Sequence, residues 1–87
     1  MAWTIEYDFA ARKNVEKLDR QTRHRLRTFI HERLATLDDP RSIGKALKGS
    51  KLGSFWRHRV GDYRIICDLQ DNLLVILVIE IGHRRDV

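Results

Sequence analysis

One alternating segment, SFWRHRVGDYRIIC (residues 54–67), restricts the fold of this chain more than any other. Apolar and polar residues alternate on both sides of Gly61-Asp62, which is typical of two half-buried antiparallel strands joined by a two-residue turn. Glycine at the first turn position suits a type II′ turn, where φ is positive. The resulting register pairs Arg59 with Arg64, and a slip of one residue would bury both arginines. The segment therefore predicts a β-hairpin with a fixed register.

The two faces of this hairpin differ in character. One face is expected to pack on helices and collects Trp56, His58, Val60, Tyr63, Ile65, Cys67 and Leu69. The other face collects Phe55, Arg57, Arg59, Arg64, Ile66 and Asp68. Charged residues are ordinary on the solvated face of an antiparallel sheet, which is one interpretation. We favour an anion site, because like charges placed opposite one another are destabilising and arginine's planar donor fork matches a phosphate.

The rest of the chain predicts an α+β domain with the order βααβββ. We expect strands at about 2–7, 54–60, 63–69 and 73–81, the last one apolar on both faces and central in the sheet. Helices are expected over residues 9–18, capped by Asp8, and over residues 20–37, ended before Pro40. Residues 40–53 are predicted to form an irregular connection with one helical turn at about 43–47. The fold is thus a single domain (1–87), with an antiparallel-rich sheet of about four strands and two N-terminal helices on one face.

Composition narrows the functional classes. The formal net charge of +5 favours polyanionic partners such as nucleic acid or an acidic protein segment. The one cysteine excludes an intramolecular disulfide, and the histidine spacing argues against a structural zinc, so we expect neither a metal nor a cofactor. The longest apolar run, LLVILVI (residues 73–79), is far short of a membrane span, and no signal-peptide pattern opens the chain. We therefore expect a cytoplasmic protein without a membrane partner.

The stretch KALKGSKLGSFWRHRVGDYRIICDLQDNLLVILVIEIGHRRDV resembles the RelE family of bacterial toxins, within the RelE/ParE superfamily. The motif elements are the W-R-H-R-V-G-D-Y-R-I-I hairpin, the apolar strand after it and the closing G-H-R-R. The N-terminal strand and two helices also match the family's architecture. The resemblance implies the toxin of a type II toxin–antitoxin system, an endoribonuclease (mRNA interferase) that cuts mRNA in the ribosomal A site without a metal. It also implies a RelB-like antitoxin as partner, with operator DNA bound only through that antitoxin.

The resemblance also implies residue roles. Arg57 and Arg59 match two basic residues that the family has on the strand before the turn. Arg64 matches an arginine that supports the transition state in the family, and Arg84 matches a C-terminal arginine that contacts phosphate. His83 is the candidate proton-transfer group, because an unperturbed imidazole titrates near pH 6.5. Other basic residues would hold mRNA or ribosomal RNA through phosphate contacts. They are Arg57, the arginines of the second helix, Lys45, Lys48, Lys51 and Arg85.

One departure keeps alternatives open. Family members carry a tyrosine shortly after the C-terminal basic cluster, assigned as general base, and this sequence shows none up to Val87. The sequence is truncated before that residue, or His83 replaces it, or cleavage is impaired; we favour truncation. A cleavage-impaired chain would survive as an antitoxin-binding or autorepression component. A ParE-like toxin, which inhibits DNA gyrase, is the other alternative, although such toxins usually lack the basic cluster on the hairpin.

Overall fold

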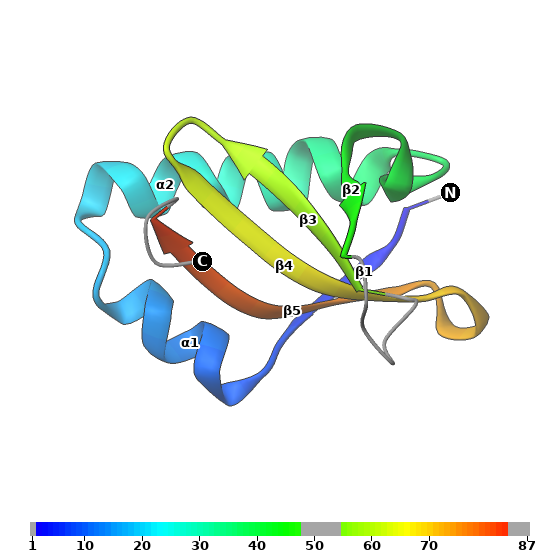
Figure 1. Ribbon diagram of the computed structural model, residues 1–87, viewed down its shortest axis with the longest axis horizontal. Helices are drawn as coiled ribbons and strands as arrows, with labels where there is room; N and C mark the ends of the chain where they lie inside the picture. The colour runs from blue at the N-terminus through cyan, green and yellow to red at the C-terminus, as the bar shows by residue number, and fades with distance from the viewer. Residues whose placement is uncertain (1, 48–54, 84–87) are drawn as a thin grey trace.

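The computed structural model describes residues 2–47 and 55–83, and its polypeptide forms two helices against a five-stranded sheet (Figure 1). The sheet order is β1-β5-β4-β3-β2. Strand β1 (Thr4–Tyr7) is parallel to β5 (Val75–His83), whereas β5, β4 (Tyr63–Gln70), β3 (Phe55–Val60) and β2 (Lys45–Ala46) are antiparallel neighbours. The α+β class, the antiparallel-rich sheet and the element order are thereby confirmed, with β2 as an additional strand.

The hairpin has the predicted register. Val60 pairs with Tyr63 and Arg59 with Arg64, so the two-residue turn at Gly61-Asp62 is confirmed. Gly61 has a φ of 59°, and Leu74 is the only non-glycine of the described residues with a positive φ, which agrees with a type II′ turn. A Cβ on Gly61 would lie 2.9 Å from the guanidinium of Arg25, so the turn lies close against the long helix.

Both helices begin at an aspartate cap, of which the sequence analysis predicted Asp8. Asp8 caps α1 (Phe9–Glu16) by accepting a 2.9 Å hydrogen bond from the Ala11 backbone N–H. Asp19 caps α2 (Arg20–Thr28) in the same way through Thr22. The long helix predicted over 20–37 is continuous to 36, but its second half widens into a π-helical segment (Phe29–Arg33) and ends in a 3-10 turn (Leu34–Thr36).

Some element boundaries and the position of one strand differ from the sequence-based expectations. The helical turn predicted near 43–47 is a 3-10 turn at Pro40–Ile43, because proline favours the first helical position and Asp39 caps it. The connection between β4 and β5 includes a 3-10 turn (Asp71–Leu73), which delays β5 to residue 75. Strand β5 is interior, as its apolar sequence requires, but the middle strand of the five is β4.

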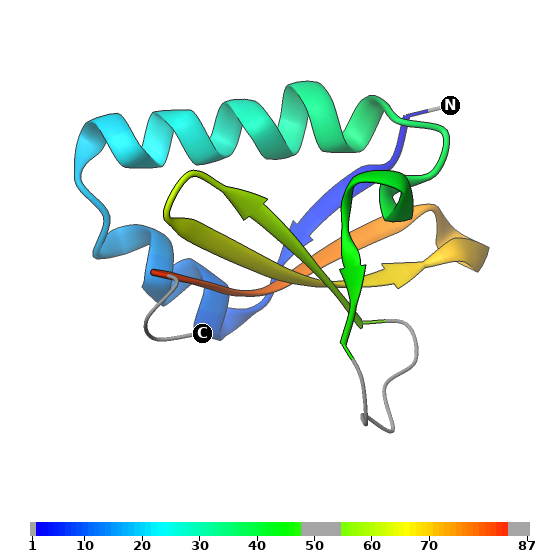
Figure 2. The same cartoon turned by 45° about the horizontal axis from the view of Figure 1, so that its top comes forward.

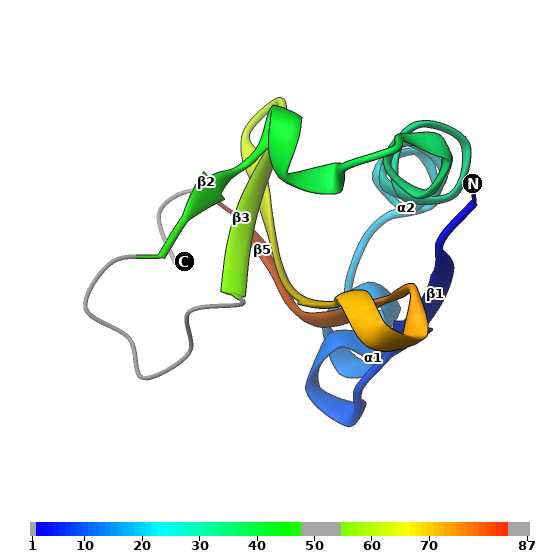
Figure 3. The ribbon, with the colours of Figure 1, turned by 90° about the vertical axis from the view of Figure 1, so that its right-hand side faces the viewer.

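The core lies between the helices and one face of the curved sheet (Figures 2 and 3). One cluster joins Ala11 of α1 and Leu26 of α2 to Ile65 of β4 and Val78 of β5. A second cluster surrounds Leu34, Cys67 and Ile76. The opposite face of β3 and β4 is left uncovered by the helices, and this face carries the hairpin arginines.

Candidate functional site

A small cleft on the uncovered sheet face collects four cations. It has a volume of about 180 Å³ and is lined by Ile43, Gly44, Lys45, Arg57, Arg59 and Arg64; we call it the arginine cleft. Two cross-strand rows build it: Lys45 lies opposite Arg57, and Arg59 lies opposite Arg64. Directly opposite side chains in a sheet have Cβ atoms about 5 Å apart, so the four charges crowd a short stretch of β2, β3 and β4.

Strand β2 is what turns a basic face into a cleft. The sequence places Lys45 in an irregular connection, but its pairing with Arg57 brings it to the edge of the arginine face. The 3-10 turn before β2 adds Ile43 and Gly44 as a wall. Alternation in this segment is too short to predict a strand, and only its pairing with β3 defines it.

A buried histidine supports the wall from behind. His58 lies between Arg57 and Arg59 in β3, points to the helix side and is fully buried, as predicted for a core position. Its Nε2–H donates a 2.9 Å hydrogen bond to the Pro40 carbonyl, which leaves Nδ1 to accept from the Cys67 thiol at 3.5 Å. This pair of contacts ties the 3-10 turn to β3, and hence positions Gly44 and Lys45 over the arginines.

Burial fixes the protonation of this support. Desolvation lowers the pKa of His58, and the hydrogen bond to Pro40 opposes that shift in part. Burial, together with the charge of Asp68, raises the pKa of the Cys67 thiol to about 12. Both groups are therefore neutral at pH 7, and Cys67 is the buried, unreactive residue that the sequence predicts.

Acidic groups near the cleft are few. Lys45, Arg57, Ile66 and Glu80 form one row across β2, β3, β4 and β5. The sequence did not predict Glu80 near this site, because it lies on a strand outside the hairpin. Asp68 lies on the same face as the arginines and pairs with Phe55, the next same-face pair after Arg57 and Ile66. The cleft lining itself contains no carboxylate among the described residues. Such a site can hold a phosphate group through several guanidinium and ammonium donors.

The other predicted site residues fall elsewhere. His83 does not line the cleft: it pairs with Tyr63, and the two rings meet edge to face at 5.5 Å in a hollow beside α1. Its role in proton transfer stays a prediction. Lys48, Lys51, Arg84 and Arg85 lie outside the described residues.

Within residues 2–47 and 55–83, no three His, Cys, Asp or Glu side chains are grouped so that they could hold a metal ion. The helices described by the structure are all too short or too polar to cross a membrane.

Comparison with known proteins gives consistent matches. Residues 5–87 match the family model described as the ParE toxin of type II toxin–antitoxin systems, parDE. The chain is 25% identical over its full length to Toxin RelG of Mycobacterium tuberculosis, of which it covers 97%.

Solved structures show the same fold. A chain of the toxin–antitoxin complex RelBE2 from Mycobacterium tuberculosis superposes with a TM-score of 0.85 at 23% identity, over 97% of this chain and 93% of that one. The isolated Escherichia coli RelE toxin superposes with a TM-score of 0.73 at 23% identity, over 94% of this chain and 84% of that one. These structures show that the fold is shared, and the family-model match over residues 5–87 confirms the superfamily that the hairpin motif indicated.

Proposed function

Because this chain belongs to the ParE toxin family of type II toxin–antitoxin systems, within the RelE/ParE superfamily, we propose that its arginine cleft is the site of its toxicity. The proposed activity is that of an endoribonuclease which cuts mRNA in the ribosomal A site and so inhibits translation. The single observation that carries this proposal is the gathering of Lys45, Arg57, Arg59 and Arg64 in one cleft without a carboxylate in its described lining. Cations at this density are explained by a phosphate that binds among them.

The chemistry follows from the charge. A ribose 2′-hydroxyl attacks the adjacent phosphate, and the 5′-oxygen of the next nucleotide leaves. Negative charge on the phosphoryl oxygens increases in the transition state, and preorganised cations stabilise it there more than in the ground state. Arg59 and Arg64, which face one another across the hairpin, are the best placed for this role.

The cleft does not supply an evident base. An arginine side chain keeps its proton at neutral pH and therefore cannot accept another one. The only imidazole adjacent in sequence to the cleft arginines, His58, is buried on the opposite face of β3. A cationic cleft nevertheless lowers the pKa of a bound hydroxyl and favours its oxyanion. The ribosome would supply the remaining rate enhancement by aligning the RNA for attack, and such an enzyme would therefore act on translated mRNA.

The proposal includes a RelB-like antitoxin. Solved structures with this fold include the intact Escherichia coli RelBE toxin–antitoxin complex, with a TM-score of 0.74 at 23% identity. An acidic antitoxin segment would be attracted to the cleft by the same charges that bind phosphate. Operator DNA would then be bound through the antitoxin, and the complex would act in the cytoplasm.

A gyrase-directed activity is the second candidate, because the matching family model is that of ParE toxins. The two activities separate experimentally. Expression of the chain should produce codon-phased cuts in translated mRNA, read by primer extension, and Arg57→Gln/Arg59→Gln should remove both the cuts and the growth arrest. Growth arrest with intact mRNA and trapped gyrase–DNA breaks would reject the nuclease. An inert chain that still binds its antitoxin would instead indicate a cleavage-impaired partner protein.

A further inference from the structure

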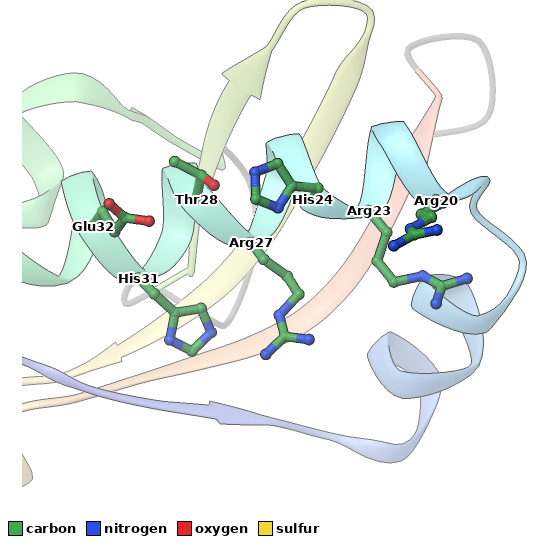
Figure 4. A pocket seen from close by; sticks show the side chains of 7 residues that line it. All are labelled: Arg20, Arg23, His24, Arg27, Thr28, His31 and Glu32. Atoms are coloured by element: carbon green, nitrogen blue, oxygen red, sulfur yellow. The ribbon is translucent and has the colours of Figure 1, made fainter.

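A second basic surface lies across the molecule from the arginine cleft, in the groove between α1, α2 and β1. Two adjoining hollows form this helix groove, one of about 390 Å³ along α2 (Figure 4) and one of about 250 Å³ between the helices. They share Arg27 and His31, so they are one continuous surface. The cleavage step proposed above does not use this groove, although the arginines of the second helix were expected from the sequence to contact RNA phosphates.

The larger hollow is bordered by a row of cations. Arg20, Arg23 and Arg27 follow one another at three- and four-residue spacing, which covers about 10 Å of helix at 1.5 Å per residue. The close-up shows Arg23, Arg27 and His31 directed to the same side of the helix (Figure 4). Arg23 is anchored by a 3.0 Å hydrogen bond from Nη2 to the Leu18 carbonyl. Glu32 is the one acidic residue in this lining.

These arginines are not neutralised within the described chain. Among residues 2–47 and 55–83, Arg41 forms ion pairs with Asp39 and Asp71, whereas no ion pair involves Arg12, Arg20 or Arg27. A linear, uncompensated row of guanidinium groups fits a ligand with regularly repeated negative charge.

The smaller hollow has a different chemistry. Its walls are Tyr7 of β1, Val15 of α1 and His31 of the π-helical segment that continues α2. Arg12 of α1 and Arg27 of α2 lie at its sides. The Tyr7 hydroxyl and His31 Nε2 are 2.8 Å apart, and the two rings stack with centroids 5.9 Å apart and planes 28° from parallel. A flat, mainly apolar hollow beside a fixed aromatic pair suits one planar base, and its volume is below that of pockets for drug-sized ligands.

We propose that the helix groove binds single-stranded RNA, with phosphates on the arginine row and one unstacked base in the hollow beside Tyr7 and His31. The inference rests on the proposed function, in which RNA is the substrate, and adds a site that would orient it. An amphipathic peptide helix fits less well, because it needs a continuous apolar groove for anchors at i, i+3, i+4 and i+7. Here the apolar hollow is short and continues directly into an arginine-lined surface.

The test separates this groove from the cleft. The starting protein carries Arg57→Gln/Arg59→Gln, so that a fluorescent single-stranded RNA remains uncut and the cleft contributes little binding. Adding Arg12→Gln/Arg27→Gln should weaken RNA binding at least tenfold and reduce the slope of log K against log salt by about 1.4, for two phosphate contacts at roughly 0.7 each. Arg33→Gln is the control: it removes one cation from the π-helical continuation of α2, outside both hollows, and should change neither quantity.

The base contact needs its own readout. Tyr7→Leu should weaken RNA binding about tenfold, in the range of one lost base–aromatic contact, and leave binding of inorganic polyphosphate unchanged. Equal losses for RNA and polyphosphate would overturn the base site. Unchanged RNA affinity in Arg12→Gln/Arg27→Gln, or an equal loss in Arg33→Gln, would overturn the groove. Loss of binding to an acidic antitoxin peptide with RNA binding intact would assign the groove to the antitoxin. None of these outcomes depends on cleavage, which primer extension measures separately.

Discussion

Replacing Gly44 by alanine should destabilise the protein, although its backbone conformation predicts the opposite. Gly44 has a φ of −123° and a ψ of 178°, which any residue adopts. Alanine would therefore normally stabilise the protein by about 0.4–1 kcal/mol, because it restricts the unfolded chain. A Cβ at this position would, however, lie 2.7 Å from Nε2 of His58 and 3.0 Å from two ring carbons.

The clash has no inexpensive relief. The His58 ring is fully buried and is held by Pro40 on one side and by Cys67 on the other. Moving it gives up the hydrogen bond to the Pro40 carbonyl, worth about 1 kcal/mol, and adds about 1–3 kcal/mol of overpacking. After the entropic gain is subtracted, Gly44→Ala should lower the free energy of unfolding by about 2 kcal/mol, or lower Tm by roughly 8–16 °C in a domain of this size.

Urea unfolding followed by circular dichroism measures this effect, and a double-mutant cycle with His58→Ala assigns it. Once the ring is removed, Gly44→Ala should cost less than about 0.5 kcal/mol, which gives a coupling energy above about 1 kcal/mol. If Gly44→Ala is as stable as the wild type, His58 does not position the wall of the arginine cleft as described. The same variant should also weaken any anion bound beside Lys45.

Three further predictions concern pH, anions and capping. Burial lowers the pKa of His58 in the folded state, so stability should be complete above the ordinary value of about 6.5 and should fall as the pH drops below it, by at most about 1.4 kcal/mol per pH unit. Between pH 7 and 5, the unfolding free energy of His58→Gln should vary less with pH than that of the wild type. His31→Gln should keep more of this pH dependence than His58→Gln. Equal slopes in the wild type and both variants would contradict the prediction. Sulfate should raise Tm more than chloride at equal ionic strength, and this difference should shrink in Arg59→Gln, because the anion relieves repulsion from the arginine opposite; an undiminished difference would place the sulfate elsewhere. Asp8→Ala should cost about 1 kcal/mol in urea unfolding through loss of the α1 cap, whereas Asn at this position should restore most of it; no loss with alanine would show that the cap does not stabilise α1.

The hairpin could be predicted because its signals are local. Alternation over residues 54–67 and the Gly61-Asp62 turn fix which side chains share a face, and the observed pairs agree with that register. The same argument placed His58 and Cys67 in the core. The cap at Asp8 could likewise be predicted from adjacent residues.

Features that depend on contacts between distant segments could not be predicted. Strand β2 has only two residues, and its cation joins the site through pairing with β3. The parallel pairing of β1 with β5 and the contact of Tyr7 with His31, 24 residues later in the chain, likewise depend on tertiary packing. For the same reason, the alternation of residues along β5 could not show where His83 lies. Its ring contacts Tyr63 in the hollow beside α1 and does not line the arginine cleft.

The most direct measurement of the central claim is primer extension on a reconstituted translation complex with a defined codon in the A site. The purified wild-type protein should cut the mRNA at that codon, and naked mRNA of the same sequence should be cut far more slowly. Arg59→Gln and Arg64→Gln should each lower the single-turnover rate by about two orders of magnitude, the usual effect of removing one transition-state donor. Lys13→Gln, which removes one positive charge from α1, should cleave at the wild-type rate. Wild-type-level cleavage by both arginine variants, or an uncut A-site codon with the wild-type protein, would contradict the assignment of the arginine cleft as a nuclease site.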